Sequence, residues 1–384
     1  MRRLVILASM MIFLDVVFYS AIAPLLPEYA DDLDLSDAQA GVLSASYAAG
    51  TLLAALPAGY VASRVGARRT VIAGLLALGF ASLVFGVAQQ ILLLDLARFC
   101  QGAAGALVWS GAMTWLINST PEENRGSVIG TALGTAVAGA LLGPALGALA
   151  GTIGTEVVFG SVLIVSLALA AAAARMPEAG QREAQSLREI RAALVSRPIR
   201  NGFVFVAVPS VMFGAVEVLV PLRLDELGGS HGVIAAGFII GAGLEALLAP
   251  IAGRISDRSG RRAPYVAGLA ICAAAMVGIA AAQALAGVFA ALIVTSFGAG
   301  FCFAPALALI SDAAVSTDLH QGFASGLSNM AWASGQVVGG VAGGGVASLT
   351  GDVVPGVAIA TLLLITIAYA FRTLSPAPLV PVKG

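Results

Sequence analysis

Long apolar stretches separated by short polar segments recur along the whole chain. A membrane-spanning helix needs about 20 mostly apolar residues, and twelve stretches meet that requirement. They lie at residues 4–26, 40–62, 70–89, 91–117, 127–151, 155–175, 201–222, 232–255, 264–283, 285–311, 321–348 and 353–374. The pattern predicts an all-α membrane protein with twelve transmembrane helices.

One long polar segment, residues 176–200, separates six predicted spans from the other six. We therefore predict an N-terminal six-helix bundle over 1–175, a cytoplasmic linker over 176–200 and a C-terminal six-helix bundle over 201–384. The composition agrees, because only 11% of the residues are charged and 59% are hydrophobic, whereas soluble domains carry about 25% charged residues. The first apolar stretch is long enough to span and contains Asp15, so we interpret it as a span and not as a cleaved signal peptide.

The basic residues predict the orientation of the chain. With the N-terminus in the cytoplasm, 18 of the 20 basic residues fall in cytoplasmic segments, whereas Arg223 lies outside and Arg98 lies within a span. An excess of arginine and lysine marks the cytoplasmic side. We expect a multi-pass protein of the cell membrane with both termini in the cytoplasm.

The two halves repeat each other. The segment GYVASRVGARR begins at Gly59, and GRISDRSGRR begins 194 residues later at Gly253. Further along, Gly139, Gly143 and Gly147 match three glycines of the second half, Gly335, Gly339 and Gly343, at an offset of 196. A six-plus-six duplication is typical of transporters, which bind substrate between the halves near the middle of the membrane.

These repeats carry motifs that resemble those of the major facilitator superfamily. Its loop signature G-x-x-x-D-R-x-G-R-R is complete in the second half, and the first-half copy departs from it at Ser63 and Ala67. RFCQGAAGA, which contains Arg98, resembles a motif of proton-coupled members, and AGALLGPALGALAG resembles the antiporter signature. The alternative for the glycines is ordinary close packing of helices. The resemblance implies a conformational role for Gly59, Arg64, Gly66, Gly139, Gly143, Pro144, Gly147, Asp257, Arg258 and Gly260.

Within the superfamily the chain resembles the drug:proton antiporters, including vesicular amine transporters and bacterial multidrug exporters. The stretch FLDVVFYSAIAPLLPEY is similar to their first span, and GAVEVLVPLRL is similar to their seventh. The resemblance implies that Asp15 and Glu217 are functional acids. One departure is Asn329, where the amine transporters tend to carry an acid.

Ionisable residues inside spans are costly and usually face a cavity or a partner. We expect Arg98, which stays charged, to pair with Asp15, so that Asp15 is poised between ionised and protonated forms. A permanent structural pair is the alternative. Glu217 and Glu245 have no basic residue in their own spans, so each is a candidate either for carrying a proton or for donating a buried hydrogen bond. We interpret Asp95 as a structural partner of Arg98, three residues away.

Aromatic side chains can complete a site for an organic cation. Tyr19 lies one helical turn from Asp15 on the same face, and Tyr47, Trp109 and Trp332 are further candidates for the lining. The predicted proton-coupling residues are Asp15, Arg98, Glu217 and Glu245. The predicted substrate-binding residues are Asp15, Tyr19, Glu217, Glu245, Asn329 and Trp332.

Together these features predict a proton-coupled antiporter that exports lipophilic, cationic or amine-bearing small molecules by rocker-switch alternating access. One alternative is an exporter of sugars or neutral metabolites with the same fold, and another is a transporter-like membrane sensor or lipid-handling protein. An ATP-driven pump is disfavoured because the chain has no G-x-x-x-x-G-K-[ST] loop. The three cysteines are far apart and indicate neither disulfides nor a metal site, and we expect no enzyme activity and no cofactor. The expected partners are a small-molecule substrate, protons and membrane lipids, with no nucleic acid, and we expect a monomer.

Overall fold

The computed structural model describes residues 2–121, 125–178, 192, 194–317, 319 and 321–375, and every regular element within them is helical. The first half contains α1 (Arg2–Ser20), η1 (Ala23–Leu25), α2 (Leu26–Asp32), α3 (Asp37–Val65), α4 (Ala67–Val87), α5 (Ile91–Ser119), α6 (Arg125–Ile153) and α7 (Thr155–Ala174). The second half contains α9 (Arg197–Glu226), α10 (His231–Ser259), α11 (Arg262–Ala281), α12 (Leu285–Ser316), α13 (Gln321–Thr350) and α14 (Val353–Thr373). Most of the predicted linker, and His320, lie outside the described residues.

The helices confirm the predicted all-α membrane fold, with two differences in the spans. Eleven helical segments of the described residues are long and apolar enough to cross a membrane. The remaining predicted span, α13, is long enough, but it is rich in glycine and contains Asn329 and Gln336, which lower its hydropathy. The first span is interrupted after Ser20, where Pro24 and Pro27 cannot donate backbone hydrogen bonds.

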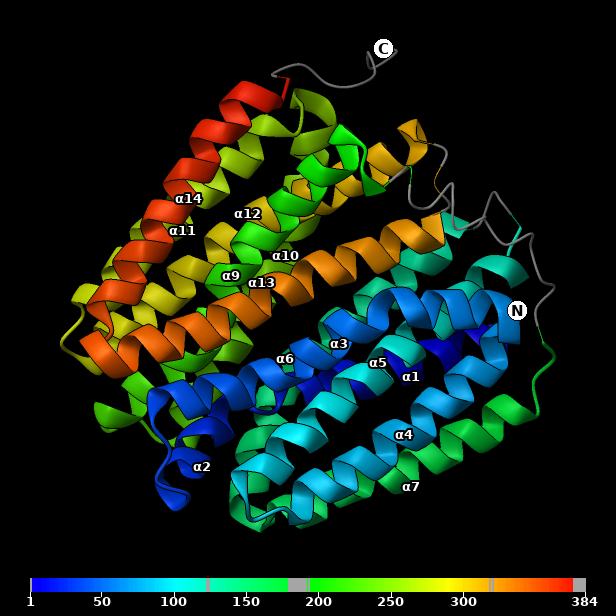
Figure 1. The fold of residues 1–384 in the computed structure, drawn as a ribbon, viewed down its shortest axis with the longest axis horizontal. Helices are drawn as coiled ribbons and strands as arrows, with labels where there is room; N and C mark the ends of the chain where they lie inside the picture. The colour runs from blue at the N-terminus through cyan, green and yellow to red at the C-terminus, as the bar shows by residue number, and fades with distance from the viewer. Residues whose placement is uncertain are drawn as a thin grey trace.

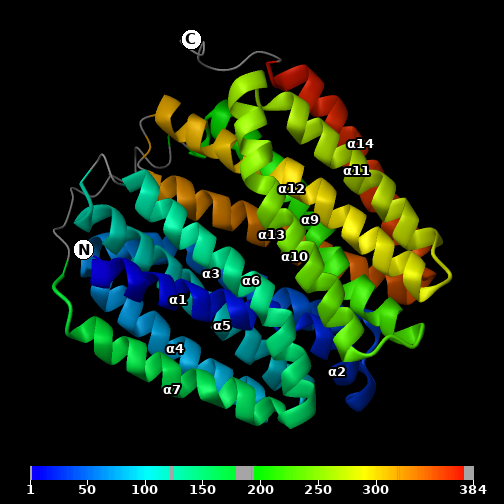
Figure 2. The same ribbon diagram turned by 180° about the vertical axis from the view of Figure 1, so that it is seen from behind.

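Two bundles of six spans pack around separate apolar cores. α1 to α7 enclose large buried rings that include Phe85, Trp115 and Phe159, and α9 to α14 enclose Phe205 and Tyr265. The bundles form the two arms seen in Figures 1 and 2, with α13 lying along α3 where they meet. The pair α4–α7 and the pair α11–α14 lie on the outer flanks of the molecule (Figure 1).

The interior packing repeats in both bundles. Glycines of α6 face α1, because a Cβ on Gly139 would lie 3.1 Å from the Phe13 carbonyl oxygen, and Gly147 faces the Ala21 carbonyl. In the second bundle Gly335 and Gly339 of α13 face the backbone of α9 in the same way. Small residues let helix backbones approach closely, so the repeated glycines of the sequence correspond to equivalent helix pairs.

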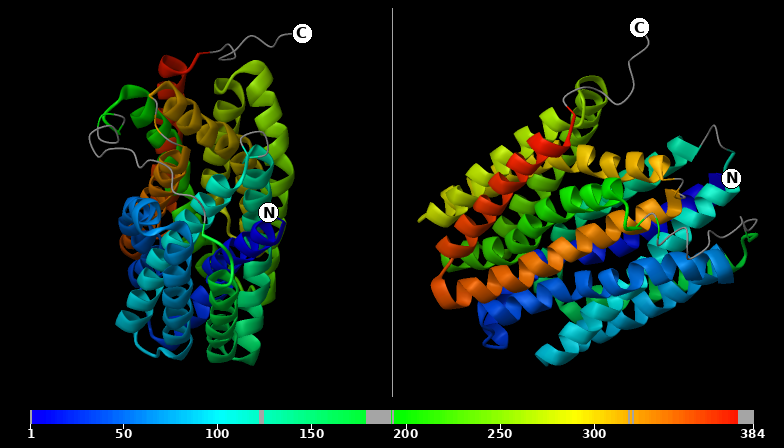
Figure 3. Two further views of the ribbon diagram at one scale, coloured as in Figure 1. Left: turned by 90° about the vertical axis from the view of Figure 1, so that its right-hand side faces the viewer. Right: turned by 45° about the horizontal axis from the view of Figure 1, so that its top comes forward.

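We call the side that carries Arg2 and Thr373 the terminal side, and the side that carries α2 and the α13–α14 turn the distal side. The outer flanks of the bundles diverge toward the terminal side, as Figure 1 shows, and Figure 3 gives two further views. On the distal side the bundles are in close contact, since Gly41 of α3 packs on the Gly340 backbone and Gly344 packs on the Asp37 backbone. Glu28 Oε2 and His231 Nε2, 3.9 Å apart, also meet across the bundles there.

Candidate functional site

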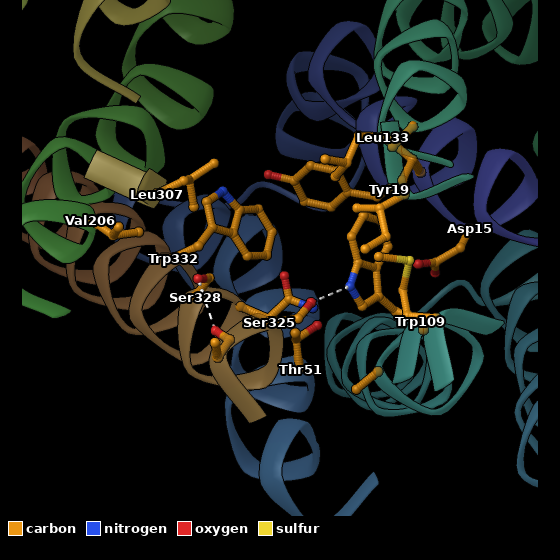
Figure 4. A pocket seen from close by; sticks show the side chains of 18 of the residues that line it. Asp15, Tyr19, Thr51, Trp109, Leu133, Val206, Leu307, Ser325, Ser328 and Trp332 are labelled. Carbon is orange, nitrogen blue, oxygen red and sulfur yellow. Dashed lines mark hydrogen bonds between the residues drawn. The ribbon is translucent and has the colours of Figure 1, made fainter. Parts of the chain in front are cut away.

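A cavity of about 410 Å³ lies between the two bundles. Figure 4 shows side chains from both bundles around it, with Tyr19 and Trp109 on the side of Asp15 and Trp332 facing them beside Leu307 and Val206. Further lining comes from small polar side chains, which include Ser325, Ser328 and Asn329 of α13. The cavity reaches toward the terminal side, because the lining includes Ile117 near the end of α5, Ile129 near the start of α6 and Ser311 near the end of α12.

Four of the six predicted substrate-binding residues line this cavity: Asp15, Tyr19, Asn329 and Trp332. Glu217 and Glu245 are not part of the lining. Among the described residues that line the cavity, Asp15 is the one acid, and no arginine, lysine or histidine accompanies it. The lining therefore combines aromatic rings with a single carboxyl group.

Asp15 is held by a tyrosine of its own bundle. It is 5% exposed, and its Oδ1 accepts a hydrogen bond of 2.7 Å from the Tyr47 hydroxyl on α3. Gly105 of α5 faces Asp15 Oδ1 and the Tyr47 hydroxyl oxygen, and a Cβ at this position would collide with both atoms. The glycine of the RFCQGAAGA motif thus makes room for the carboxyl group.

Arg98 does not form the ion pair with Asp15 that the sequence predicts. Its guanidinium donates to the carbonyl oxygens of Phe18 (3.3 Å) and Tyr19 (3.2 Å) and to Gln101 Oε1 (3.1 Å). α1 ends at Ser20, and the last carbonyls of a helix have no partner in the helix, so they are available to the arginine.

The neighbours of Arg98 keep it apart from both aspartates. Its guanidinium lies over the ring of Tyr47, 5.1 Å from the centroid, and over Phe85 at 5.7 Å. The predicted structural pair with Asp95 is also wrong, since the Arg98 guanidinium donates to Phe18, Tyr19 and Gln101 and Asp95 interacts with Ser46. Tyr47 therefore contacts both ionisable groups and separates Arg98 from Asp15.

Tyr19 connects the cavity to Glu217 in the other bundle. Its hydroxyl donates to Glu217 Oε1 at 2.6 Å and accepts from Gln336 Nε2 at 2.8 Å. Its ring packs against Tyr47, with centroids 4.9 Å apart, and against Trp332, 5.3 Å apart at near right angles. Glu217 thus reaches the cavity through Tyr19.

A second hydrogen bond joins the bundles at the cavity. Trp109 Nε1 on α5 donates to Ser325 Oγ on α13 at 3.3 Å, as the dashed line in Figure 4 shows. Both residues lie closer to the terminal side than Asp15, because α5 and α13 have their terminal-side ends at Ser119 and Gln321. The cavity continues past this contact toward the terminal side, where Ile117, Ile129 and Ser311 line it.

Glu245 lies inside the second bundle. It is on α10, where Gly300 of α12 packs against its backbone, and it contributes nothing to the cavity wall. No cluster of three or more potential metal ligands occurs among the described residues. The fold brings Asp15, Tyr19 and Glu217 together beside the cavity, whereas Glu245 lies behind Glu217 and does not line the cavity.

The predicted loop motifs occupy the turns on the terminal side, whereas Gly139, Gly143, Pro144 and Gly147 lie within α6. Gly66 and Gly260 adopt left-handed backbone conformations, with φ of 107° and 88°, at the α3–α4 and α10–α11 turns. In the second turn Arg261 contacts Asp257 and Asp312, at 2.5 and 3.1 Å. The equivalent positions of the first turn are the neutral Ser63 and Ala67. Glycine is favoured at both turns because side chains rarely adopt positive φ.

Sequence reasoning missed one residue of the first turn. Glu178, directly after α7, pairs with Arg68 at 3.3 Å and accepts its backbone N–H at 2.9 Å. Arg68 also donates to the Met176 carbonyl, and Trp115 donates to the Pro177 carbonyl. No local pattern in the sequence indicated this pairing, because Glu178 lies 110 residues from Arg68 along the chain.

Two repeated six-helix bundles around a central cavity are the architecture of a membrane transporter. The chain belongs to the Major Facilitator Superfamily, whose family model matches residues 8–314 and 232–384. The superfamily resemblance inferred from the loop and span motifs is thereby confirmed.

Curated relatives match only part of the chain. It is 29% identical over 128 residues to the MFS-type transporter ppzB of Metarhizium rileyi, covering 32% of this chain and 26% of the relative. It is 32% identical over 104 residues to the multidrug resistance protein MdtL of Vibrio parahaemolyticus, covering 27% and 26%. The matches thus span about a quarter of the length of these relatives.

Solved structures share the fold over nearly the whole chain. A bacterial homologue of the human lysosomal transporter Spinster, in an inward-facing and occupied conformation, has a TM-score of 0.81 at 15% identity. The structural match covers 97% of this chain and 96% of the bacterial homologue. A D-xylose–proton symporter has a TM-score of 0.75 at 16% identity, with 97% of both chains covered. At these identities the likeness establishes the fold alone.

Proposed function

We propose that this protein is a proton-coupled antiporter that exports lipophilic cationic or amine-bearing small molecules across the cell membrane. The observation that carries the proposal is the cavity lining, in which one carboxyl group, Asp15, lies among tyrosine and tryptophan rings without a basic side chain. Aromatic faces attract cations, and an unneutralised acid attracts them further, whereas an anionic substrate would find no positive partner.

The orientation follows from the positive-inside rule. With 18 of the 20 basic residues on one side, both termini are cytoplasmic, and the terminal side of the structure faces the cytoplasm. The cavity then opens inward while the glycine contacts between α3 and α13 close the outer side. Each bundle moves as one body, so that opening one side closes the other.

Proton coupling follows from competition for the same acids. A cation that binds next to Asp15 favours the ionised carboxylate, and a proton on that carboxylate disfavours the cation. Asp15 and Glu217 are the residues proposed to exchange protons, and Arg98 holds the end of α1 that carries Tyr19. Glu245, which does not reach the cavity, is proposed to have no contact with substrate.

The test is transport by the purified protein in liposomes with an imposed pH gradient. Tetraphenylphosphonium serves as a lipophilic cation and xylose as a neutral polar solute. We expect uphill movement of the cation, driven by the gradient and abolished by an uncoupler. Movement of xylose without the cation would instead support the sugar-exporter alternative and overturn the proposal.

A further inference from the structure

The two acids near the cavity differ in the bundle that supplies their hydrogen-bond donors. Asp15 on α1 accepts from Tyr47 on α3, within the first bundle. Glu217 on α9 accepts from Tyr19 on α1, across the interface between the bundles. When two bodies rock against each other, contacts inside each body persist and contacts between them are remade. The donor to Asp15 therefore stays in place during the cycle, and the donor to Glu217 does not.

The Tyr19–Glu217 contact lies beside the distal closure. Gln336, which donates to the same tyrosine hydroxyl, is one helical turn from Gly340, whose Cβ position lies 3.1 Å from Ala45 of α3. Opening the distal side separates α3 from α13 and draws α1 away from α9. The hydrogen bond from Tyr19 to Glu217 belongs to the conformation in which the terminal side is open.

From this geometry we infer that the cross-bundle hydrogen bond from Tyr19 to Glu217 couples protonation to the change of conformation, while Asp15 acts as the counter-charge of the cation. The inference rests on the proposed function, and it assigns cation recognition to Asp15 and proton coupling to Glu217. Tyr19 is a positioning residue, because it acts by setting the surroundings of Glu217. Its ring also packs against Trp332 in the cavity wall, so a bound cation influences Glu217 through Tyr19.

The direction of coupling follows from the strength of the bond. A hydrogen bond to an ionised carboxylate is about twice as strong as one between neutral groups. Ionised Glu217 therefore stabilises the conformation described here, and protonated Glu217 favours the opposite one. The ionisable groups that face Glu217 are Tyr19 on α1, Arg98 on α5 and Glu245 on α10, and α13 presents the neutral Gln336. Forming the bond and releasing the proton toward the terminal side are thus linked.

The matched variants are Tyr19→Phe and Tyr47→Phe, because each removes one hydroxyl and keeps the ring. Spin labels on the exposed terminal-side residues Val65 and Val315, introduced as V65C and V315C with Cys100→Ala, report the separation of the bundles. The full chain is reconstituted in liposomes, and the distance distribution is measured as the pH falls from about 8 to about 5.

In the unmodified background we expect the long-distance population to decrease as the pH falls. Tyr19→Phe should reduce the ratio of long to short distances at high pH by about tenfold and flatten its pH dependence. Tyr47→Phe should keep the pH dependence. A Tyr19→Phe curve that superimposes on the unmodified one, or an equal loss in Tyr47→Phe, would overturn the inference. Thermal unfolding of each variant checks that the fold is intact, and Glu217→Gln, which keeps one acceptor oxygen for Tyr19 and removes the titratable group, should give a distance distribution independent of pH.

Failure of the proposed function gives a different result. If Asp15→Asn bound tetraphenylphosphonium as tightly as the unmodified protein, Asp15 would not be the counter-charge, whatever the spin labels showed. If Asp15→Asn weakened cation binding as expected but Tyr19→Phe left the spin-label distances and their pH dependence unchanged, only the inference would be contradicted.

Discussion

The two bundles share a fold and differ in how they hold charge. The first bundle surrounds Asp15 and Arg98 with partners of its own, namely Tyr47, Gln101 and the carbonyls at the end of α1. The second bundle places Gln336 and Glu245 near Glu217, and the hydroxyl that donates to the Glu217 carboxyl group comes from Tyr19 of the first bundle. Repetition of a backbone therefore does not repeat its chemistry, and the asymmetry places one acid inside a moving body and the other between two bodies.

The turns on the terminal side show the same contrast at the surface. In the second bundle Arg261 joins Asp257 to Asp312 on α12. In the first bundle both members of the Asp257–Arg261 pair are replaced, by Ser63 and Ala67. Because the acid and the base are absent together, no charge is left unpaired at those positions. The first turn is tied instead to the residues that follow α7, through Arg68 and Glu178.

The largest effect is expected for Asp15→Asn, which removes the carboxylate of the first bundle. A hydrogen bond or ion contact to a charged group contributes about 1.5–3 kcal/mol, so the affinity for a lipophilic cation should fall about 10- to 150-fold. Uphill transport should be lost with it. Radioligand binding and transport in liposomes measure both effects.

The matched control is Asp95→Asn, the same substitution in the same bundle. Asp95 does not line the cavity, so its variant should bind the cation like the unmodified protein. Equal losses in the two variants would show that a buried acid of the first bundle is needed for folding and not for recognition.

The next largest effect is expected for Trp332, an aromatic residue that the second bundle contributes to the cavity wall. A cation–π contact in a desolvated site is worth about 2 kcal/mol, so Trp332→Ala should weaken cation binding by up to about 30-fold. Trp332→Phe retains a ring face and should cost only a few-fold. If both variants bound equally well, recognition would lie in the first bundle alone.

The surface turns should give smaller effects on stability. Partly exposed ion pairs contribute about 0–1 kcal/mol, so Glu178→Gln and Arg261→Ala should each lower the free energy of unfolding by no more than about that amount. Ser63→Asp should change the free energy of unfolding by no more than about 0.5 kcal/mol, as is usual for surface substitutions, whereas Ala67 is buried in the core of the first bundle and does not accept an arginine there. Thermal unfolding measures these changes, and a loss well above about 1 kcal/mol for Glu178→Gln would contradict the comparison.

The smallest effect is expected for Glu245→Gln. This acid lies between α10 and α12, outside the cavity wall, so cation affinity should change by no more than about twofold, as for substitutions away from a site. A loss as large as that of Asp15→Asn would place a second substrate-contacting acid in the second bundle.

The sequence predicted the architecture well because hydropathy and charge act locally. The spans, the repeat and Tyr19 beside Asp15 follow from length and helical spacing. α13 is the instructive exception among the spans, since the glycines that let it approach α3 and α9 also lower its hydropathy.

The partners of the buried charges could not be read from the sequence, because they depend on where helices end and cross. Arg98 binds the end of α1 and not Asp15, since the break after Ser20 leaves carbonyl groups without helical partners. Tyr47 was one of several possible lining residues, and nothing in its spacing indicated that its hydroxyl meets Asp15. Glu178 lies more than 100 residues from Arg68, so only the fold brings them together.

Proton release on cation binding tests the central claim most directly. Tetraphenylphosphonium is added to the detergent-solubilised protein in weakly buffered solution at a pH near 6, with a pH-sensitive dye to count protons. A site in which a cation and protons compete for Asp15 and Glu217 predicts proton release that saturates with binding and is absent in the Asp15→Asn, Glu217→Gln double variant. Cation binding without proton release, at any pH from about 5 to about 8, would contradict the account.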